Sequence, residues 1–171
     1  WYGTWSDASA KSLVTTFIGN LSNSKYWAIN NAYTNSSKKK IPKVLTLAGQ
    51  TTDDYSQGRT NLNTASFAAA VSSAITTNAL PKDENGIYLV LTSADVTVTD
   101  FMVKFCGWHT ATTVAGSSIK FSFVGDANKA GACTPQQTSP NANAQVDAML
   151  SVIAHELAET VTDPNLNAWY D

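Results

Sequence analysis

The sequence predicts a single α+β domain over residues 1–171, in which a mixed β-sheet packs against helices. The chain is 43% apolar and 14% charged, which is the balance of one globular domain with a sizeable core. Stretches with the helical spacing of apolar residues alternate with short runs of β-forming residues. The last helical stretch is the longest, and it carries two of the three glutamates in the chain.

The first part of the chain predicts two helices and a strand. Ser6 or Asp7 can cap a helix, because apolar residues then recur at the helical spacing as far as Leu21. Residues 24–33 predict a second, shorter helix. Residues 43–48 (KVLTLA) predict a strand, because β-forming residues dominate them.

The middle of the chain predicts a loop, a helix and a buried strand. Residues 49–63 are rich in Gly, Thr, Asp and Ser, which favours a loop. An alanine-rich helix then begins at Thr64 and ends before Pro81. Residues 87–91 form a nearly continuous apolar run, which is typical of a central strand. Residues 96–105 fit no single element.

The last third predicts a hairpin, a long loop and a helix. Residues 110–114 and 119–124 predict two strands joined by a turn. Residues 125–143, rich in Gly, Ala, Asn, Pro and Ser, predict an irregular loop, and loops of this length are often functional. Residues 144–162 predict the strongest helix, with one apolar stripe formed by Val146, Met149, Leu150, Ile153, Leu157 and Val161.

Charge and hydropathy exclude some classes of partner. The net charge of −2 and isoelectric point near 5.6 give no electrostatic reason to expect nucleic acid or an anionic membrane. No apolar stretch approaches the ~20 residues of a membrane span. Lys38, Lys39 and Lys40 form the only basic run, which we interpret as a solvated loop.

Cysteine content and chain start favour a secreted protein. Cys106 and Cys133 permit one bridge, and we favour a disulfide over a buried free pair. The chain opens at Trp1 without an initiator Met, which we interpret as a processed product. The triplets that begin at Asn20 and Asn35 fit the N-glycosylation pattern and add weak support.

The run His155-Glu156-Leu157-Ala158-Glu159 is the strongest chemical signal in the sequence. Residues four apart lie on one side of a helix, so His155 and Glu159 could hold one metal ion, with Glu156 beside them as a general base. The alternative is a solvated polar face, since this side lies roughly opposite the apolar stripe.

A catalytic zinc needs three protein ligands and one open position for water. The third ligand would be His109, which follows Cys106 and would be braced by a disulfide, or Asp163, which Pro164 holds outside the helix. A histidine ligand favours zinc. Calcium is the lesser alternative, because Glu159 and Asp163 offer oxygen donors.

Other chemistries have less support in the sequence. It contains no G-x-S-x-G elbow, no Walker loop and no G-x-G-x-x-G motif. A sugar-stacking platform is an alternative use of the aromatic residues, although core packing accounts for most of them. The aromatic residues concerned are Trp1, Tyr2, Trp5, Trp27, Trp108, Trp169 and Tyr170.

Several blocks along the whole chain resemble one family. They are WYGTWS, then IYLVLTSADV followed by DF and CGWH, then FVGD, and finally SVIAHELAETVTDPNLNAWYD. Together, and in this order, they resemble the phosphate-induced protein 1 family, which includes the plant EXORDIUM and EXORDIUM-like proteins. The resemblance implies a secreted protein of the cell wall or apoplast that is linked to growth responses, with no settled biochemical activity.

Two features depart from the pattern of that family. Members often carry a cysteine where this chain has Met102, and others in the later loop, so the disulfide set is reduced here to one bridge. Members also tend to continue past the NAWY stretch with an acidic motif and another cysteine. A further metal ligand could therefore lie beyond Asp171.

Two functional hypotheses follow. The order of elements, ending in a helix with H-E-x-x-E, is similar to the layout of zincin metallopeptidases. Our leading hypothesis is a secreted, zincin-like metal-binding domain with hydrolase chemistry of the peptidase type, acting on an extracellular peptide. The competing hypothesis is a non-catalytic extracellular protein that binds a cell-wall polysaccharide or a protein partner in growth signalling. We expect a monomer in both cases.

Overall fold

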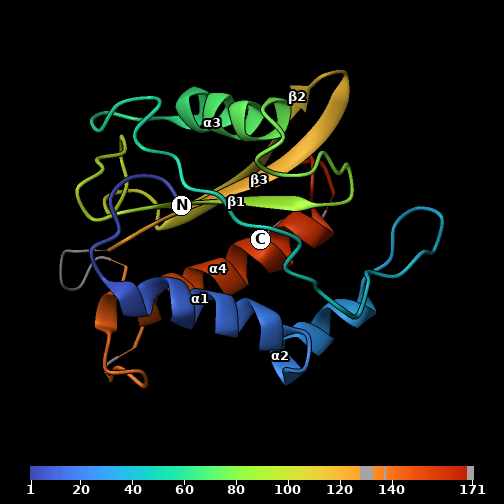
Figure 1. Cartoon of the computed structure of the whole chain (residues 1–171). Coiled ribbons are helices and arrows are strands. Elements are labelled where there is room, and N and C mark those ends of the chain that lie inside the picture. Colours follow the sequence, from blue (N-terminus) through green and yellow to red (C-terminus); the bar gives the residue numbers. More distant parts are fainter. Residues whose placement is uncertain (128–132, 137, 169–171) are drawn as a thin grey trace.

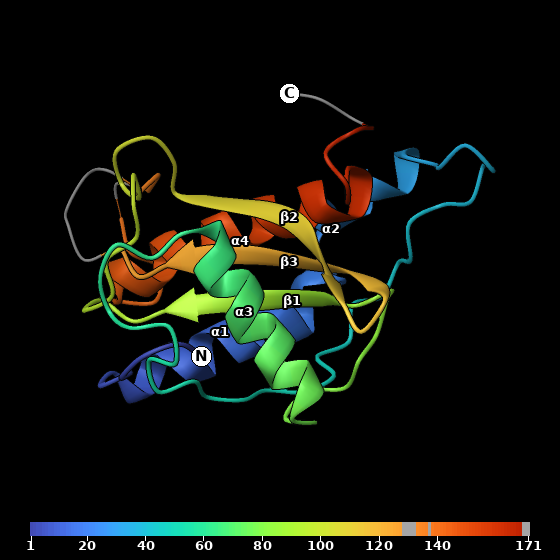
Figure 2. The same cartoon turned by 90° about the horizontal axis from the view of Figure 1, so that it is seen from above.

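A three-stranded mixed sheet separates two helical layers in the computed structural model, which describes residues 1–127, 133–136 and 138–168. The strand order is β1-β3-β2. Strand β1 (Ile87–Thr92) is parallel to β3 (Ser117–Gly125), and β3 is antiparallel to β2 (Gly107–Val114). Figures 1 and 2 show the helix α3 on one face of the sheet, with α1 and α4 on the other. The predicted α+β class with a mixed sheet is confirmed.

The predicted helices are present and begin at side-chain caps. Helix α1 (Ala8–Leu21) starts after Asp7, whose side chain accepts a hydrogen bond from the Ser9 N–H. Helix α3 (Thr64–Thr76) starts with a capping box between Asn63 and Ser66. The remaining helices are α2 (Lys25–Ala28), capped by Ser24, the 3₁₀ helix η1 (Ile29–Ala32), and α4 (Ala144–Thr162), capped by Asn143.

Strand β3 supplies both hydrophobic cores, because its side chains alternate between the two faces of the sheet. Phe121 and Phe123 are fully buried on the α3 side, where Phe123 stacks on Phe67. Val124 is fully buried on the opposite side, in a cluster with Ile153 of α4. The central strand is therefore covered on both faces, and α4 is held against it.

The β2–β3 hairpin closes through Ala115 and Gly116, which both have positive φ, of 46° and 78°. Two-residue hairpin loops favour this left-handed backbone conformation. Strand β2 begins at Gly107, three residues before the predicted start, because its ladder with β3 continues as far as Val124. As a result, His109 lies within a strand.

The predicted strand over residues 43–48 is wrong: this segment has no regular secondary structure. A strand exists only where another strand offers a hydrogen-bonding ladder. Residues 44–49 instead line a cavity, whose opposite side is β1, and the Leu45 N–H donates to the Ser22 hydroxyl. The β-forming side chains are present, but none of the strands in the described part of the chain lies beside them.

The remaining segments are mostly irregular, as predicted for residues 49–63 and for the described part of 125–143. The ambiguous segment 96–105 contains only turns and isolated β-bridges. Cys106 and Cys133 form the favoured disulfide. None of the helices in the described residues is long and apolar enough to cross a membrane.

Candidate metal centre

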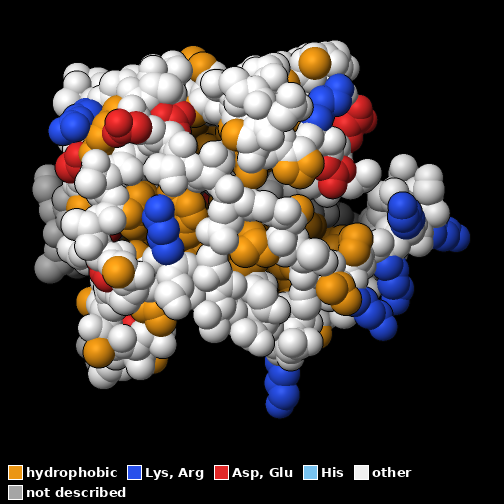
Figure 3. Space-filling model, in the orientation of Figure 1, with side chains coloured by type: hydrophobic (Ala, Val, Ile, Leu, Met, Phe, Trp, Pro, Cys, Tyr) orange, Lys and Arg blue, Asp and Glu red, His pale blue; other side chains and the backbone are white. Residues whose placement is uncertain are grey.

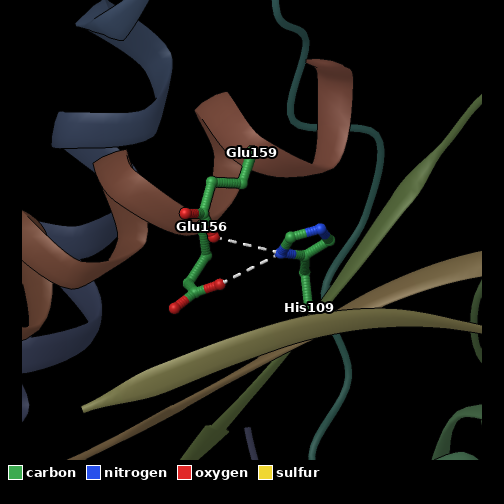
Figure 4. Close-up of side chains that lie close together, drawn as sticks. All are labelled: His109, Glu156 and Glu159. Carbon is green, nitrogen blue, oxygen red and sulfur yellow. Dashed lines mark ion pairs between the residues drawn. The ribbon is translucent and has the colours of Figure 1, made fainter. Parts of the chain in front are cut away.

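His109 is placed by the alternation of side chains along β2. Its neighbour Trp108 points to the α3 side, where it packs edge-on against Phe121. His109 therefore points to the α4 side, in register with Ser122 of β3. Figure 4 shows its imidazole directed at two carboxylates of α4, those of Glu156 and Glu159.

The three side chains form one compact cluster. Nδ1 of His109 lies 3.5 Å from Oε2 of Glu156 and 3.2 Å from Oε2 of Glu159. The His109 side chain is 8% exposed, Glu156 is 3% exposed and Glu159 is 26% exposed. Oε2 of Glu156 is buried and has no hydrogen-bond partner among the described residues, since 3.5 Å exceeds a directional bond.

Gly107 allows α4 to approach β2 this closely. A Cβ atom on Gly107 would lie 2.6 Å from Cγ1 of Val152 and 2.7 Å from Oε1 of Glu156. It would also lie 2.9 Å from the carbonyl oxygen of Phe123. The side chain of Glu156 therefore occupies the space that any other residue at position 107 would fill.

The other ring nitrogen of His109 fixes its tautomer. Nε2 lies 3.1 Å from the backbone carbonyl oxygen of Asp163. A carbonyl can only accept a hydrogen bond, so Nε2 carries a hydrogen and donates it. Nδ1, which lies between the two glutamates, is then left to bind a proton or a cation. Metal-bound histidines commonly donate their other ring N–H to a carbonyl or carboxylate in the same way.

The electrostatics of the cluster favour positive charge at His109. The Glu156 carboxylate is the main cause that raises the pKa of His109 above its ordinary value, while burial of the imidazole lowers it. The Asp163 carbonyl and the negative charge of Glu159 raise this pKa further. Two carboxylates around one imidazole thus attract a proton or a metal ion to the same point.

The two distances from His109 Nδ1 fit a tetrahedral zinc ion. With metal–ligand bonds of about 2.1 Å, two ligand atoms of a tetrahedron lie about 3.4 Å apart. The distances from His109 Nδ1, 3.2 Å and 3.5 Å, bracket that value. The three candidate ligand atoms all lie within 4.8 Å of one another. One nitrogen and two carboxylate oxygens form a donor set that zinc accepts, and the unpartnered oxygen of Glu156 would gain a partner.

His155 is placed at the edge of this cluster. Its Nε2 lies 3.0 Å from Oε1 of Glu159, so the predicted contact between His155 and Glu159 exists. However, the His155 side chain is 60% exposed, and the carboxylate oxygen that faces His109 is the other one. His155 can therefore orient Glu159 from the solvent side.

The carboxylate of Asp163 is engaged elsewhere. Its Oδ1 accepts hydrogen bonds from the backbone N–H groups of Asn167 and Ala168. Asp163 thus contributes its backbone carbonyl to the site, whereas its side chain fixes the turn after α4. Among the predicted site residues, the structure brings together His109, Glu156 and Glu159, with His155 beside them.

One signal for the inward position of Glu156 was present in the sequence. Glu156 follows Met149 by seven residues, so the two side chains point in directions that differ by only about 20° around the helix axis. Glu156 therefore lies at the edge of the apolar stripe, and the structure buries it together with Thr160. Thr160 in turn shares a buried hydrogen bond with Ser122 of β3.

A cleft of about 420 Å³ opens beside the cluster. His109, His155 and Glu159 line one part of it, and Tyr26 and Ile29 of the α2–η1 segment are among the residues that line the rest. Burial and the charge of Glu159 raise the pKa of the Tyr26 hydroxyl. The cluster is thus accessible from one side, through a cleft with aromatic and aliphatic side chains.

The aromatic residues do not gather into one exposed platform in the described part of the chain. Tyr2 and Trp27 are only 1% and 2% exposed and belong to the cores. Trp1 and Trp5 contact each other edge-on. Trp169 and Tyr170 lie outside the described residues.

These features define an α+β protein with a candidate cation centre of one imidazole and two carboxylates between an edge strand and the last helix. The phosphate-induced protein 1 conserved region matches residues 1–171, and the chain belongs to this family. The family resemblance of the sequence blocks is therefore confirmed.

Individual relatives are longer than this chain. Protein EXORDIUM-like 5 and Protein EXORDIUM-like 3 of Arabidopsis thaliana are each 34% identical to it over 198 residues. These matches cover 99% of this chain, but 54% and 58% of the relatives. Protein PHOSPHATE-INDUCED 1 of Nicotiana tabacum is 28% identical over 200 residues, which cover 99% of this chain and 61% of that protein. No solved structure matches.

Proposed function

We propose that the protein is an extracellular metal-binding domain in which His109, Glu156 and Glu159 hold zinc, and that this centre supports hydrolysis of a peptide. The observation that carries the proposal is the convergence of two carboxylate oxygens, at 3.5 Å and 3.2 Å, on the one imidazole nitrogen that the Asp163 carbonyl leaves available. Calcium is less suited to this set, because one donor is an imidazole nitrogen.

Bound zinc would supply a Lewis acid and a water of lowered pKa. Glu156 was expected to be a general base, but its 3% exposure and its contact with Gly107 favour a role as ligand. Glu159 and His109 also line the cleft, so a peptide can approach them from that side. A zincin-like arrangement fits the packing of the H-E-x-x-E helix α4 on the sheet after the last strand.

Metal titration of the chelator-treated protein tests the proposal. We expect one equivalent of zinc to bind and to raise the melting temperature. His109→Gln and Glu159→Gln should abolish binding, whereas His155→Ala should weaken it only modestly, because His155 contacts the opposite oxygen of Glu159. Glu84→Gln is the matched control, since Glu84 is the third glutamate and is exposed. Absence of stoichiometric zinc binding in the folded wild type would end the proposal.

Hydrolysis is tested separately on the zinc-loaded protein. A panel of extracellular-type peptides should be cleaved by the wild type and not by His109→Gln. If zinc binds with the expected dependence on His109 but no peptide or glycan is cleaved, the ion is structural.

A non-catalytic role is the second candidate, and one observation favours it. The raised pKa of His109 allows an imidazolium to neutralise the two glutamates without any metal. The cluster would then join α4 to β2, and the protein would act by binding a cell-wall polysaccharide or a protein partner. A wild-type protein whose melting temperature is the same with zinc and with chelator is the result expected from this alternative.

A further inference from the structure

Among the described residues, no strand lies beside one edge of β1 over most of its length. Successive residues of a strand direct their backbone groups to alternate sides. The Leu91 carbonyl accepts from the Tyr2 N–H, and the Ser93 N–H donates to the Tyr2 carbonyl. Ile87 and Leu89, which are two and four residues before Leu91, therefore direct their N–H and C=O groups to this same outer edge. None of the described residues hydrogen-bonds them there.

A cavity lies along this open edge. It has a volume of about 680 Å³, and it is lined on one side by β1 and on the other by residues 41–54. Residues of α1 and α3 line it below and above. Figure 3 shows hydrophobic side chains exposed in the middle of this face, between the layers of α3 and α1.

The size of the cavity fits a short stretch of extended chain. Strands are about 4.8 Å apart, sheet layers are about 10 Å thick and each residue rises about 3.3 Å, so one strand residue occupies about 160 Å³. A volume of about 680 Å³ then accommodates about four residues.

Residues 1–3 already form the end of such a strand. Tyr2 pairs in parallel with Thr92 of β1 on one side and with Asp53 on the other. The Gly3 N–H donates to the Asp53 carbonyl, and the Asp53 N–H donates to the Trp1 carbonyl. In this register Leu91 faces Trp1, and residues 87–90 face the four positions that precede Trp1. This is the number of residues that the cavity accommodates.

The amino group of Trp1 lies where a peptide group would fit better. It donates to the Thr51 carbonyl at 2.9 Å, and Trp1 lines the cavity. Burial is the main cause that lowers the pKa of this amine to about 6. A buried charge is costly, whereas a backbone N–H at the same point would donate the same hydrogen bond without charge.

We propose that the open edge of β1 accepts a further strand, parallel to β1, formed by the polypeptide immediately upstream of Trp1 in a longer form of the chain. The matches cover 54%, 58% and 61% of three curated relatives, so members of the family have residues outside the region that this chain matches. In this register the four upstream residues would lie beside residues 48–51, so Ala48 is the one residue of the segment 43–48 that gains a partner. Since Asp53 pairs with Tyr2, Ala48 would face the residue five positions before Tyr2. The inference does not depend on the metal centre.

The register predicts which amides respond. Tyr2 directs its N–H and C=O to β1, so the first and third residues upstream of Trp1 do the same. Their carbonyls would accept from the N–H groups of Leu91 and Leu89. Their own N–H groups would donate to the carbonyls of Leu89 and Ile87.

Hydrogen exchange on three forms of the protein tests the proposal: the chain from Trp1, the chain with Thr-Val-Thr-Val before Trp1, and a form with proline at the first and third upstream positions. The Thr-Val-Thr-Val extension should slow exchange of the Leu89 and Leu91 amides at least about tenfold, since each gains a sheet hydrogen bond. The proline form should not slow it, because the Leu89 and Ile87 carbonyls then have no donor and proline is excluded from central strands, so the added strand does not form. The Val90 amide, which faces β3, is the internal control and should be unchanged.

Two outcomes would overturn the proposal. One is equal exchange of the Leu89 amide in all three folded forms. The other is protection of Leu89 by a free Thr-Val-Thr-Val peptide when the same extension, covalently attached, gives none. That result would assign the edge to a separate polypeptide.

Discussion

Replacement of Gly107 by alanine tests the close approach of α4 to β2. All three nearest atoms to the added Cβ would lie under 3.0 Å, at 2.6, 2.7 and 2.9 Å. The last is the carbonyl oxygen of Phe123, which belongs to the central strand and cannot shift without disturbing the sheet. Overpacking of this kind costs about 1–3 kcal/mol.

Part of this cost is offset, because alanine restricts the unfolded chain more than glycine does, by about 0.5–1 kcal/mol. We therefore expect Gly107→Ala to lower the free energy of unfolding by about 1–2 kcal/mol. For a chain of this size the melting temperature should fall by about 2–8 °C. Because the clash includes Oε1 of Glu156, zinc binding should weaken as well.

The matched control is Gly19→Ala. Gly19 lies in α1, and an added Cβ there has no atom within 4 Å. Alanine in a helix should then stabilise the protein by about 0.5–1 kcal/mol, the opposite sign. Urea unfolding of both variants measures the difference. A denaturation midpoint for Gly107→Ala equal to that of the wild type, with Gly19→Ala stabilised as expected, would refute the packing described for the site.

Three further predictions concern the same region. The pKa of His109 is raised in the folded protein, so in chelator its contribution to the free energy of unfolding should be complete below pH about 6.5 and lost as the pH rises through the raised pKa. Urea unfolding should show this pH dependence in the wild type and not in His109→Gln. At pH 5, Glu156→Gln should lower the free energy of unfolding by about 3 kcal/mol, because it leaves a buried imidazolium with one carboxylate, and Glu84→Gln should have no effect. Cys133→Ser should lower it by about 3–4 kcal/mol, since the bridge to Cys106 closes a separation of 27 residues, and a wild-type protein insensitive to reductant would contradict this.

Local signals in the sequence predicted the helices well. Asp7, Asn63 and Asn143 are short polar residues placed before apolar periodic stretches, and each caps a helix. Such caps depend on residues within one turn, so a single sequence contains the information. The run 87–91 likewise became β1, because its apolar residues are buried between two helical layers.

Contacts between distant segments were harder to predict. Residues 43–48 have the side chains of a strand, but strand formation depends on a neighbour that the local sequence does not specify. His109 or Asp163 was expected as a third ligand for a pair formed by His155 and Glu159, and whether any of these residues binds a metal stays a prediction. The structure instead pairs His109 with Glu156 and Glu159, because the antiparallel register with β3 and the space at Gly107 determine which carboxylates it meets.

The strand order β1-β3-β2 puts the two unusual features of this molecule at opposite margins of one small sheet. The histidine–glutamate cluster lies between β2 and α4, and the open edge belongs to β1. Strand β3 lies between β1 and β2. Every residue of the cluster comes from the contiguous stretch 107–163, whereas the open edge of β1 would be filled by the strand that we propose upstream of Trp1. A substitution in the histidine–glutamate cluster should therefore leave the open edge of β1 unchanged. A change at that edge should likewise leave the cluster unchanged.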